Sequence, residues 1–201
     1  MRKLSYLIPV LVIVMGCSQP QGKSSRLTDE ELNIIQNSEG IMRVLTTESP
    51  EDMKVLRTKS IDIPAEDLRL EAYRTLTDMM LATVTHPSQD GVGIAAPQVG
   101  LNRRVVAVQR FDKEGAPFEV YPNIRIVWAS DSLAAGPEGC LSVPNRRGEV
   151  MRSQEIIIEY ADVTRLEEGN YMVRDTVQNF TAVIFQHEID HLEGILYIDK
   201  L

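Results

Sequence analysis

Residues Phe185–Gly194 read FQHEIDHLEG and place His187 and His191 four positions apart, with Glu188 directly after the first histidine. Side chains four residues apart lie on one face of an α-helix, so both imidazoles can reach one metal ion. Glu188 would lie about 100° further around that helix, beside the ion, where a general base is needed. An ordinary solvated helix can carry the same letters, so the metal hypothesis requires a third ligand from elsewhere in the chain.

Cys140, in the stretch GPEGCLSVP, is the obvious third ligand. The chain has two cysteines, which are too few for a disulfide framework. A buried, inert thiol is the alternative. A thiolate and two imidazoles suit borderline ions, and three protein ligands leave a fourth position open for water. A closed structural site would need a fourth ligand. The one further histidine, His86, is followed by Pro87 in a loop segment. A carboxylate could still be the fourth ligand of a structural site.

The first sixteen residues, MRKLSYLIPVLVIVMG, have the layout of a signal peptide. Arg2 and Lys3 form its basic start, and the apolar run that follows is too short to cross a bilayer. The end of this segment, VMGC, resembles a bacterial lipobox, in which Cys17 becomes the lipidated first residue. We therefore expect an exported lipoprotein, anchored in a membrane and facing away from the cytoplasm. A secretory peptide cut elsewhere and a buried hydrophobic N-terminus are the alternatives.

The polar stretch SQPQGKSS after Cys17 is typical of a flexible tether. We assign residues 17–40 to the tether and an N-terminal extension, and residues 41–201 to one catalytic domain with enough chain for a core. The net charge of −8 becomes more negative when Arg2 and Lys3 are removed, so nucleic acid is not an expected partner. We expect a monomer.

The pattern of apolar residues predicts an α+β fold. Helical spacing favours a long helix over Ala65–Val84, directly after Pro64. Residues Leu27–Ile41 carry a weaker helical pattern. Five short runs rich in β-branched and aromatic residues predict strands separated by turns: Val105–Gln109, Phe118–Tyr121, Ile124–Trp128, Glu155–Tyr160 and Tyr171–Val177.

The glycine-rich stretch DGVGIAAPQVG matches a dinucleotide fingerprint in its letters, at Gly91, Gly93 and Ala96. The fingerprint requires a strand before it and a helix opening within it, whereas here a helix and a polar loop precede. A nucleotide site is therefore excluded in favour of a ligand-lining segment. Glycine lets the backbone approach a ligand closely, so we expect Val92 and Gly93 to contact substrate and Gln98 to supply an amide donor.

Three stretches, GVGIAAPQ, EGCLS and QHEIDHLEG, resemble the signature motifs of peptide deformylases, in the order of that family. The resemblance runs from about Ile41 to the C-terminus. It implies antiparallel sheets packed around a metal-binding HExxH helix in a single domain. It also implies that the enzyme removes the N-formyl group from N-formylmethionyl peptides and releases formate.

The same resemblance assigns roles to individual residues. It implies that Cys140, His187 and His191 bind one divalent ion, Fe²⁺ first and Zn²⁺ or Ni²⁺ as alternatives. It makes Glu188 the catalytic carboxylate. It also implies that Gln98 and the backbone amide of Leu141 stabilise the oxyanion. The export signal is a departure, because this family normally works in the cytoplasm.

The residue chemistry fits hydrolysis of an amide. A bound divalent ion lowers the pKa of its water to about 7 when the ion is zinc, so that hydroxide is available to attack a carbonyl carbon. Glu188 would take the proton and return it to the leaving amine. Donors such as the Gln98 amide would stabilise the charge on the carbonyl oxygen by about 3 kcal/mol each.

Val183 and Ile184 lie one helical turn before His187 and share its face, so we expect an apolar wall that accepts a methionine side chain. Plain core residues would show the same spacing. Asp190 lies off the ligand face, and we expect it to support nearby backbone. Two other functions remain open from the residues alone: a metallopeptidase of another HExxH family, and a non-catalytic surface lipoprotein with a structural metal.

Overall fold

The computed structural model describes residues 25–38 and 40–201, so the expected signal peptide, Cys17 and most of the tether lie outside the described residues. Within this part of the chain, no helix is long and apolar enough to cross a bilayer. The helices are α1 (Asp29–Gln36), α2 (Pro50–Leu56), α3 (Glu71–Val84) and α4 (Asn179–Leu192). Short 3-10 helices are η1 (Asp67–Arg69), η2 (Ala96–Val99), η3 (Val163–Glu168) and η4 (Tyr197–Lys200).

The strands form three antiparallel sheets. One sheet has the order β1-β2-β3 and a second has the order β4-β7-β8, while β5 and β6 form a two-stranded hairpin. The strands are β1 (Gly93–Ala95), β2 (Val105–Gln109), β3 (Phe118–Pro122), β4 (Arg125–Ala129), β5 (Leu133–Cys140), β6 (Val143–Ser153), β7 (Glu155–Ala161) and β8 (Met172–Gln178). Helices and antiparallel strands in one domain confirm the α+β prediction.

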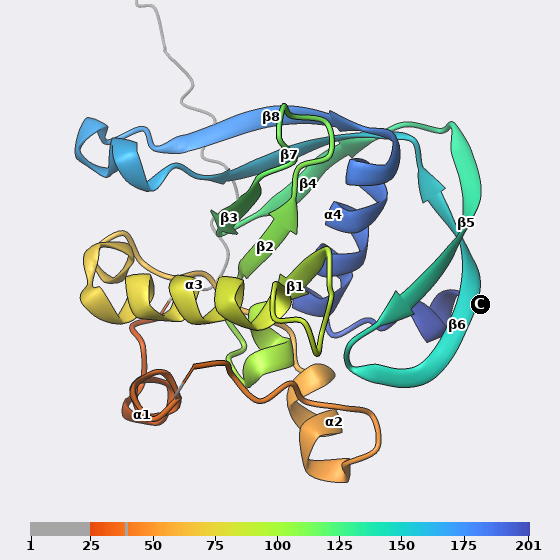
Figure 1. Ribbon diagram of the computed structural model, residues 1–201. Coiled ribbons are helices and arrows are strands. Elements are labelled where there is room, and N and C mark those ends of the chain that lie inside the picture. Colours follow the sequence, from red (N-terminus) through yellow and green to blue (C-terminus); the bar gives the residue numbers. More distant parts are fainter. Residues whose placement is uncertain (1–24, 39) are drawn as a thin grey trace, which may run out of the picture.

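Helix α4 lies between β1 and β2 on one side and the β5–β6 hairpin on the other (Figure 1). Its apolar side chains, among them Phe185 and Leu192, are fully buried against the strands. Burial of each such side chain contributes about 1.5–3 kcal/mol, which fixes the helix in the middle of the fold. A polar side chain on α4 is therefore held in a defined place by its apolar neighbours.

All five predicted strands are present within one or two residues of the expected bounds. Three others, β1, β5 and β6, were not predicted. The sequence of β5, LAAGPEGC, contains two glycines and a proline, which are depleted in strands, and much of the hairpin is exposed. Its strand conformation comes from pairing with β6, from Leu133 opposite Ser153 to Cys140 opposite Val143.

The prediction of one helix over Ala65–Val84 was wrong at its start. Helix α3 begins at Glu71, because Leu70 is extended and separates it from η1. The carboxylate of Asp67 accepts hydrogen bonds from Arg26 Nε at 3.0 Å and from the backbone N–H of Leu27 at 2.7 Å. These contacts with the N-terminal extension stabilise η1 in place of another helical turn.

The described part of the N-terminal extension is attached to the domain by a buried arginine, Arg103, whose side chain is 2% exposed. Its guanidinium donates to both carboxylate oxygens of Glu31 at 2.6 Å and to the carbonyl oxygens of Ser25 and Arg26 at 2.5 and 2.7 Å. Ile35 of α1 is buried in the core with α3. The extension is thus part of the folded domain from Ser25 onward.

Glu31→Ala is expected to lower the free energy of unfolding by about 2–3 kcal/mol, because it leaves the buried guanidinium of Arg103 without its carboxylate. Glu31 is 15% exposed, which makes the loss smaller than for a fully buried pair. Chemical denaturation would measure it. The control is Glu30→Ala, an exposed change on the same helix that should stay within about 0.5 kcal/mol. Equal stability of the two variants would contradict the role of this ion pair.

Candidate metal centre and active site

Three candidate ligands meet at one side of α4. Cys140, at the end of β5, and His187 and His191, on adjacent turns of α4, each offer one ligand atom, and these atoms all lie within 4.8 Å of one another. The Sγ of Cys140 lies 3.2 Å from Nε2 of His191. One ion with ligand distances of about 2.0–2.3 Å fits between atoms at this spacing. The structure therefore brings together the three residues that the sequence predicted.

The sequence places Cys140 there through the β5–β6 hairpin. The strand register shifts between Gly139 and Cys140, where the tight turn to Val143 begins, and the hairpin packs on α4. Ala182 and Phe185 bury one face of α4 in the core, and both histidines contact residues of β5 in the hairpin, His191 at Cys140 and His187 at Glu138. Cys140 is the last residue of β5, a strand that the sequence did not predict.

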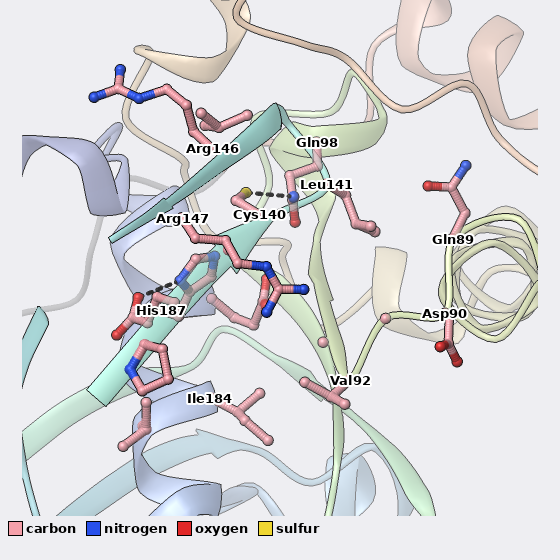
Figure 2. Close-up of a pocket in the computed structure, with 18 of the residues that line it drawn as sticks. Gln89, Asp90, Val92, Gln98, Cys140, Leu141, Arg146, Arg147, Ile184 and His187 are labelled. Atoms are coloured by element: carbon pink, nitrogen blue, oxygen red, sulfur yellow. Dashed lines mark hydrogen bonds and ion pairs between the residues drawn. The ribbon is translucent and has the colours of Figure 1, made fainter. Parts of the chain in front are cut away.

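A buried carboxylate orients His187. Nδ1 of His187 lies 2.7 Å from Oε2 of Glu138 (Figure 2). Arg152 donates to both oxygens of Glu138 at 2.7 and 2.9 Å. Burial alone would raise the pKa of Glu138, but the hydrogen bonds from Arg152 and His187 lower it to about 2, so the group is ionised at neutral pH. A carboxylate on Nδ1 leaves Nε2 of His187 free to face Cys140 and an ion.

The two histidines differ in their electrostatics: burial and the neighbouring His187 lower the pKa of His191, whereas the pKa of His187 is raised. Burial lowers the pKa of His187, but hydrogen bonds with Cys140 and Glu138 outweigh burial and raise it to about 10. A divalent ion at the same point would satisfy the same negative groups, with both imidazoles neutral. This electrostatic setting and the sulfur–nitrogen donor set fit a bound borderline metal ion.

Glu188 lies beside the three ligands and is 4% exposed. Its Oε2 is buried and has no hydrogen-bond partner among the residues that the structure describes. Burial raises the pKa of Glu188 to about 7, near the range at which a carboxylate exchanges protons at neutral pH. An unpaired buried carboxylate is costly to maintain, and its presence here points to a functional group.

Gly93 of β1 makes room for Glu188. A Cβ at this position would lie 2.5 Å from Oε1 of Glu188 and 2.9 Å from its Cγ and Cδ. Because β1 and α4 are both buried, no other residue fits without displacement of the carboxylate. The strand β1 pairs antiparallel with β2, which agrees with the exclusion of a parallel dinucleotide-binding unit.

The amide of Gln98, in η2, is held in one orientation. Its Oε1 accepts from the backbone N–H of Ala95 at 2.8 Å, so Nε2 faces Ser142 Oγ at 3.2 Å. Nε2 also faces Cys140 Sγ at 3.5 Å (Figure 2). Leu141 lies next to Cys140 at the wall of the same cavity. The expected donor residues thus lie beside the ligands.

Cys140 and His187 line a cavity of about 820 Å³, as does Glu188. Val92, Gly93, Val183 and Ile184 line it, which is the placement that the sequence predicted for substrate contacts.

Asp190 was expected to bind nearby backbone, and this was wrong. Its carboxylate binds the side chains of Arg152 at 2.5 Å and Lys200 at 2.6 Å. Sequence reasoning also missed Glu138 and Arg152, whose role depends on contacts between strands and a distant helix.

Comparisons with known proteins agree on one family. The family model for polypeptide deformylase matches residues 41–201. A peptide deformylase of Caulobacter sp. is 40% identical over 163 residues, which cover 80% of this chain and 88% of the relative. One from Halothermothrix orenii is 34% identical over 154 residues, or 74% of this chain and 95% of the relative.

The chain belongs to the peptide deformylase family.

Solved deformylase structures share the fold. A class I type b peptide deformylase from Acinetobacter baumannii superposes with a TM-score of 0.71 at 32% identity, covering 81% of this chain and 100% of the other. The enzyme from Thermotoga maritima gives a TM-score of 0.68 at 29% identity, covering 81% of this chain and 99% of the other. The family and fold predicted from the three motifs are confirmed, and the family is metal-dependent.

Proposed function

We propose that this deformylase hydrolyses the formyl amide of N-formylmethionyl peptides at the centre formed by Cys140, His187 and His191, with Glu188 moving the protons. The observation that carries the proposal is the gathering of three ligand atoms within 4.8 Å beside a buried, unpaired carboxylate. Membership of the deformylase family supports N-formyl removal and does not favour a peptidase or a non-catalytic metal protein.

Cys140, His187 and His191 would hold one divalent ion, with Fe²⁺ as the proposed ion and Zn²⁺ or Ni²⁺ as alternatives. When bound, such an ion lowers the pKa of water and polarises a carbonyl oxygen. A ferrous site on an exported protein is exposed to oxidation, so Fe²⁺ is expected if the source organism is anaerobic. Elemental analysis of anoxically purified protein tests the identity of the ion.

Glu188 would accept a proton from the attacking water and return it to the leaving amine. Its burial keeps bulk water from competing for that proton, and Gly93 allows its carboxylate to approach β1 closely. The pKa of Glu188, about 7 in the absence of an ion, would fall beside a divalent cation. The carboxylate would then be ionised and able to accept a proton.

Gln98 and the Leu141 amide would stabilise the negative charge that develops on the formyl oxygen. The hydrogen bond from Ala95 fixes Gln98 with Nε2 toward Cys140, so the donor needs no reorientation during the reaction. A fixed donor of this kind contributes about 3 kcal/mol to the transition state.

Val92, Gly93, Val183 and Ile184 would receive the methionyl residue. Ile184 is buried, and an unbranched thioether side chain adapts well to an apolar wall of this shape. The Acinetobacter baumannii enzyme has been solved with Met-Ala-Ser bound, which supports a methionyl peptide as the ligand of this chain.

A formate-release assay with formyl-Met-Ala-Ser tests the function. We expect formate release that stops in the presence of a chelator and returns on addition of Fe²⁺, Zn²⁺ or Ni²⁺ under anoxic conditions. Acetyl-Met-Ala-Ser and internal peptides are the controls, because a metallopeptidase would cleave peptide bonds in them. Activity unaffected by the chelator would refute metal dependence.

Glu138→Gln is expected to weaken metal binding by about 10- to 100-fold, because an uncharged amide on Nδ1 makes His187 a poorer ligand. Competition with a chelator of known affinity, followed by metal analysis, measures the change. The control Glu149→Gln changes an exposed carboxylate on β6 and should leave metal affinity unaltered. Unchanged affinity in Glu138→Gln would contradict the orienting role.

We also propose that the enzyme is a lipoprotein anchored through Cys17 and facing away from the cytoplasm, where it meets formylated peptides after their release. The supporting observation is the N-terminal segment with its VMGC ending. Radiolabelled fatty acid should be incorporated in wild type and not in Cys17→Ser. External protease should digest the domain in intact spheroplasts, and full protection without lipid on Cys17 would refute this placement.

A further inference from the structure

One of the charged groups that line the cavity is the guanidinium of Arg147 on β6. Figure 2 shows the side chain of Arg147 extending into the cavity, with its guanidinium between His187 and Asp90 in this view, whereas the side chain of Arg146, at the rim, runs in another direction. The guanidinium of Arg147 makes no hydrogen bond or ion pair with any other residue that the structure describes. It is a free cation at the mouth of the active site.

The local structure places the stem of Arg147, an exposed residue, next to Gly139. Arg147 lies opposite Gly139 in the β5–β6 register, and its side chain folds over that glycine. A Cβ on Gly139 would lie 3.6 Å from Cγ and 3.9 Å from Nε of Arg147. The stem of the arginine therefore lies against the strand one residue before Cys140, and its head group is held near the ligands.

The other charges of the cavity leave Arg147 unneutralised. Glu138 is already paired with Arg152 and His187, and Asp90 lies on the opposite side of the cavity in Figure 2. Glu188 also lines the cavity but is 4% exposed, with its carboxylate against Gly93. The chain has a net charge of −8, so its surface is not basic as a whole. An unpaired arginine at the cavity is therefore a local feature.

We propose that Arg147 binds a carboxylate on the substrate, and that the preferred substrates are formyl di- and tripeptides with a free C-terminal carboxylate. This inference rests on the proposed deformylase function. An extended peptide advances about 3.4 Å per residue, so a peptide whose formyl group lies at the ligands carries its second or third residue past Gly139. A guanidinium at that point forms a charge-assisted, bidentate pair with a carboxylate.

The test compares formyl-Met-Ala with its C-terminal amide, and with formyl-Met-Glu amide, which carries the carboxylate on a side chain. We expect wild type to prefer the free acid over the amide by about five- to tenfold in kcat/KM. The preference should lie in KM, because the pair forms equally in ground and transition states. It should shrink when ionic strength rises from about 0.05 M to about 0.5 M. Equal preference for formyl-Met-Glu amide would move the recognised carboxylate to a side chain and refute the terminal assignment.

Arg147→Gln should abolish the preference and leave kcat on the amide near the wild-type value. Arg146→Gln is the matched control, because it removes the same charge from the neighbouring position at the rim of the cavity, where the side chain runs in another direction than that of Arg147. Its preference should stay within about twofold of wild type. A preference that survives in Arg147→Gln, or a fall in kcat on the amide, would refute the proposal. Turnover of neither acid nor amide would instead refute the deformylase function, and this inference with it.

Discussion

Glu188→Gln is expected to retain the metal ion and to lose about 10²- to 10⁴-fold in kcat on formyl-Met-Ala-Ser. The amide has nearly the shape of the carboxylate but cannot accept the proton of the attacking water. Metal should remain bound, because the three ligand atoms come from Cys140 and the two histidines. Formate release and metal content, measured on the same preparation, test the two parts of the expectation separately.

A control variant and the metal content of Glu188→Gln help to interpret the measurement. Glu149→Gln, an exposed change on β6, should have wild-type kinetics. A metal-free Glu188→Gln protein would instead show that the carboxylate contributes to holding the ion. Near-normal turnover by metal-loaded Glu188→Gln would falsify the assignment of Glu188 as the proton carrier.

Gly93→Ala should lower kcat by about a hundredfold or more although it adds one methyl group. The added Cβ would overlap Oε1 of Glu188 at 2.5 Å, so the carboxylate must leave its position. A displacement of about 1 Å at a reacting group costs on the order of 100-fold. Strain in the buried strand should also lower stability by about 1–3 kcal/mol, which a thermal melt would detect.

Gly136→Ala is the matched control on β5, because no atom lies within 4 Å of its added Cβ, and it should retain wild-type activity. A double-mutant cycle tests the mechanism of the loss. If Gly93→Ala acts by displacing the carboxylate, it should cost little further activity in Glu188→Gln. Additive losses would show that the methyl group acts on something else, such as the approach of substrate.

The parts of the site that the sequence predicted depend on local spacing. His187, Glu188 and His191 share one helix, where the spacing of residues determines which side chains meet. Cys140 was found because few other ligands remained in the chain. The apolar face of α4 was predictable for the same reason, since its periodicity is that of a buried helix.

The parts that the sequence did not predict depend on contacts between distant segments. The carboxylate of Glu138 meets Arg152 across the hairpin and His187 49 positions away, and neither contact follows from a short motif. The β5–β6 hairpin escaped prediction because its glycines and proline resemble a loop. The start of α3 was misplaced because Asp67 is held by Arg26, far away in sequence.

The buried Arg103 also determines how far the enzyme can travel if Cys17 carries a lipid. Since Ser25 and Arg26 are bonded to this arginine, only residues 18–24 remain to link the anchor to the domain. At roughly 3.3–3.6 Å per residue, this link extends no more than about 25–30 Å. The catalytic cavity would then be confined to a layer about one domain diameter deep next to the bilayer. The enzyme would process formyl peptides as they leave the membrane surface, at a rate set by their local concentration there rather than in the bulk medium.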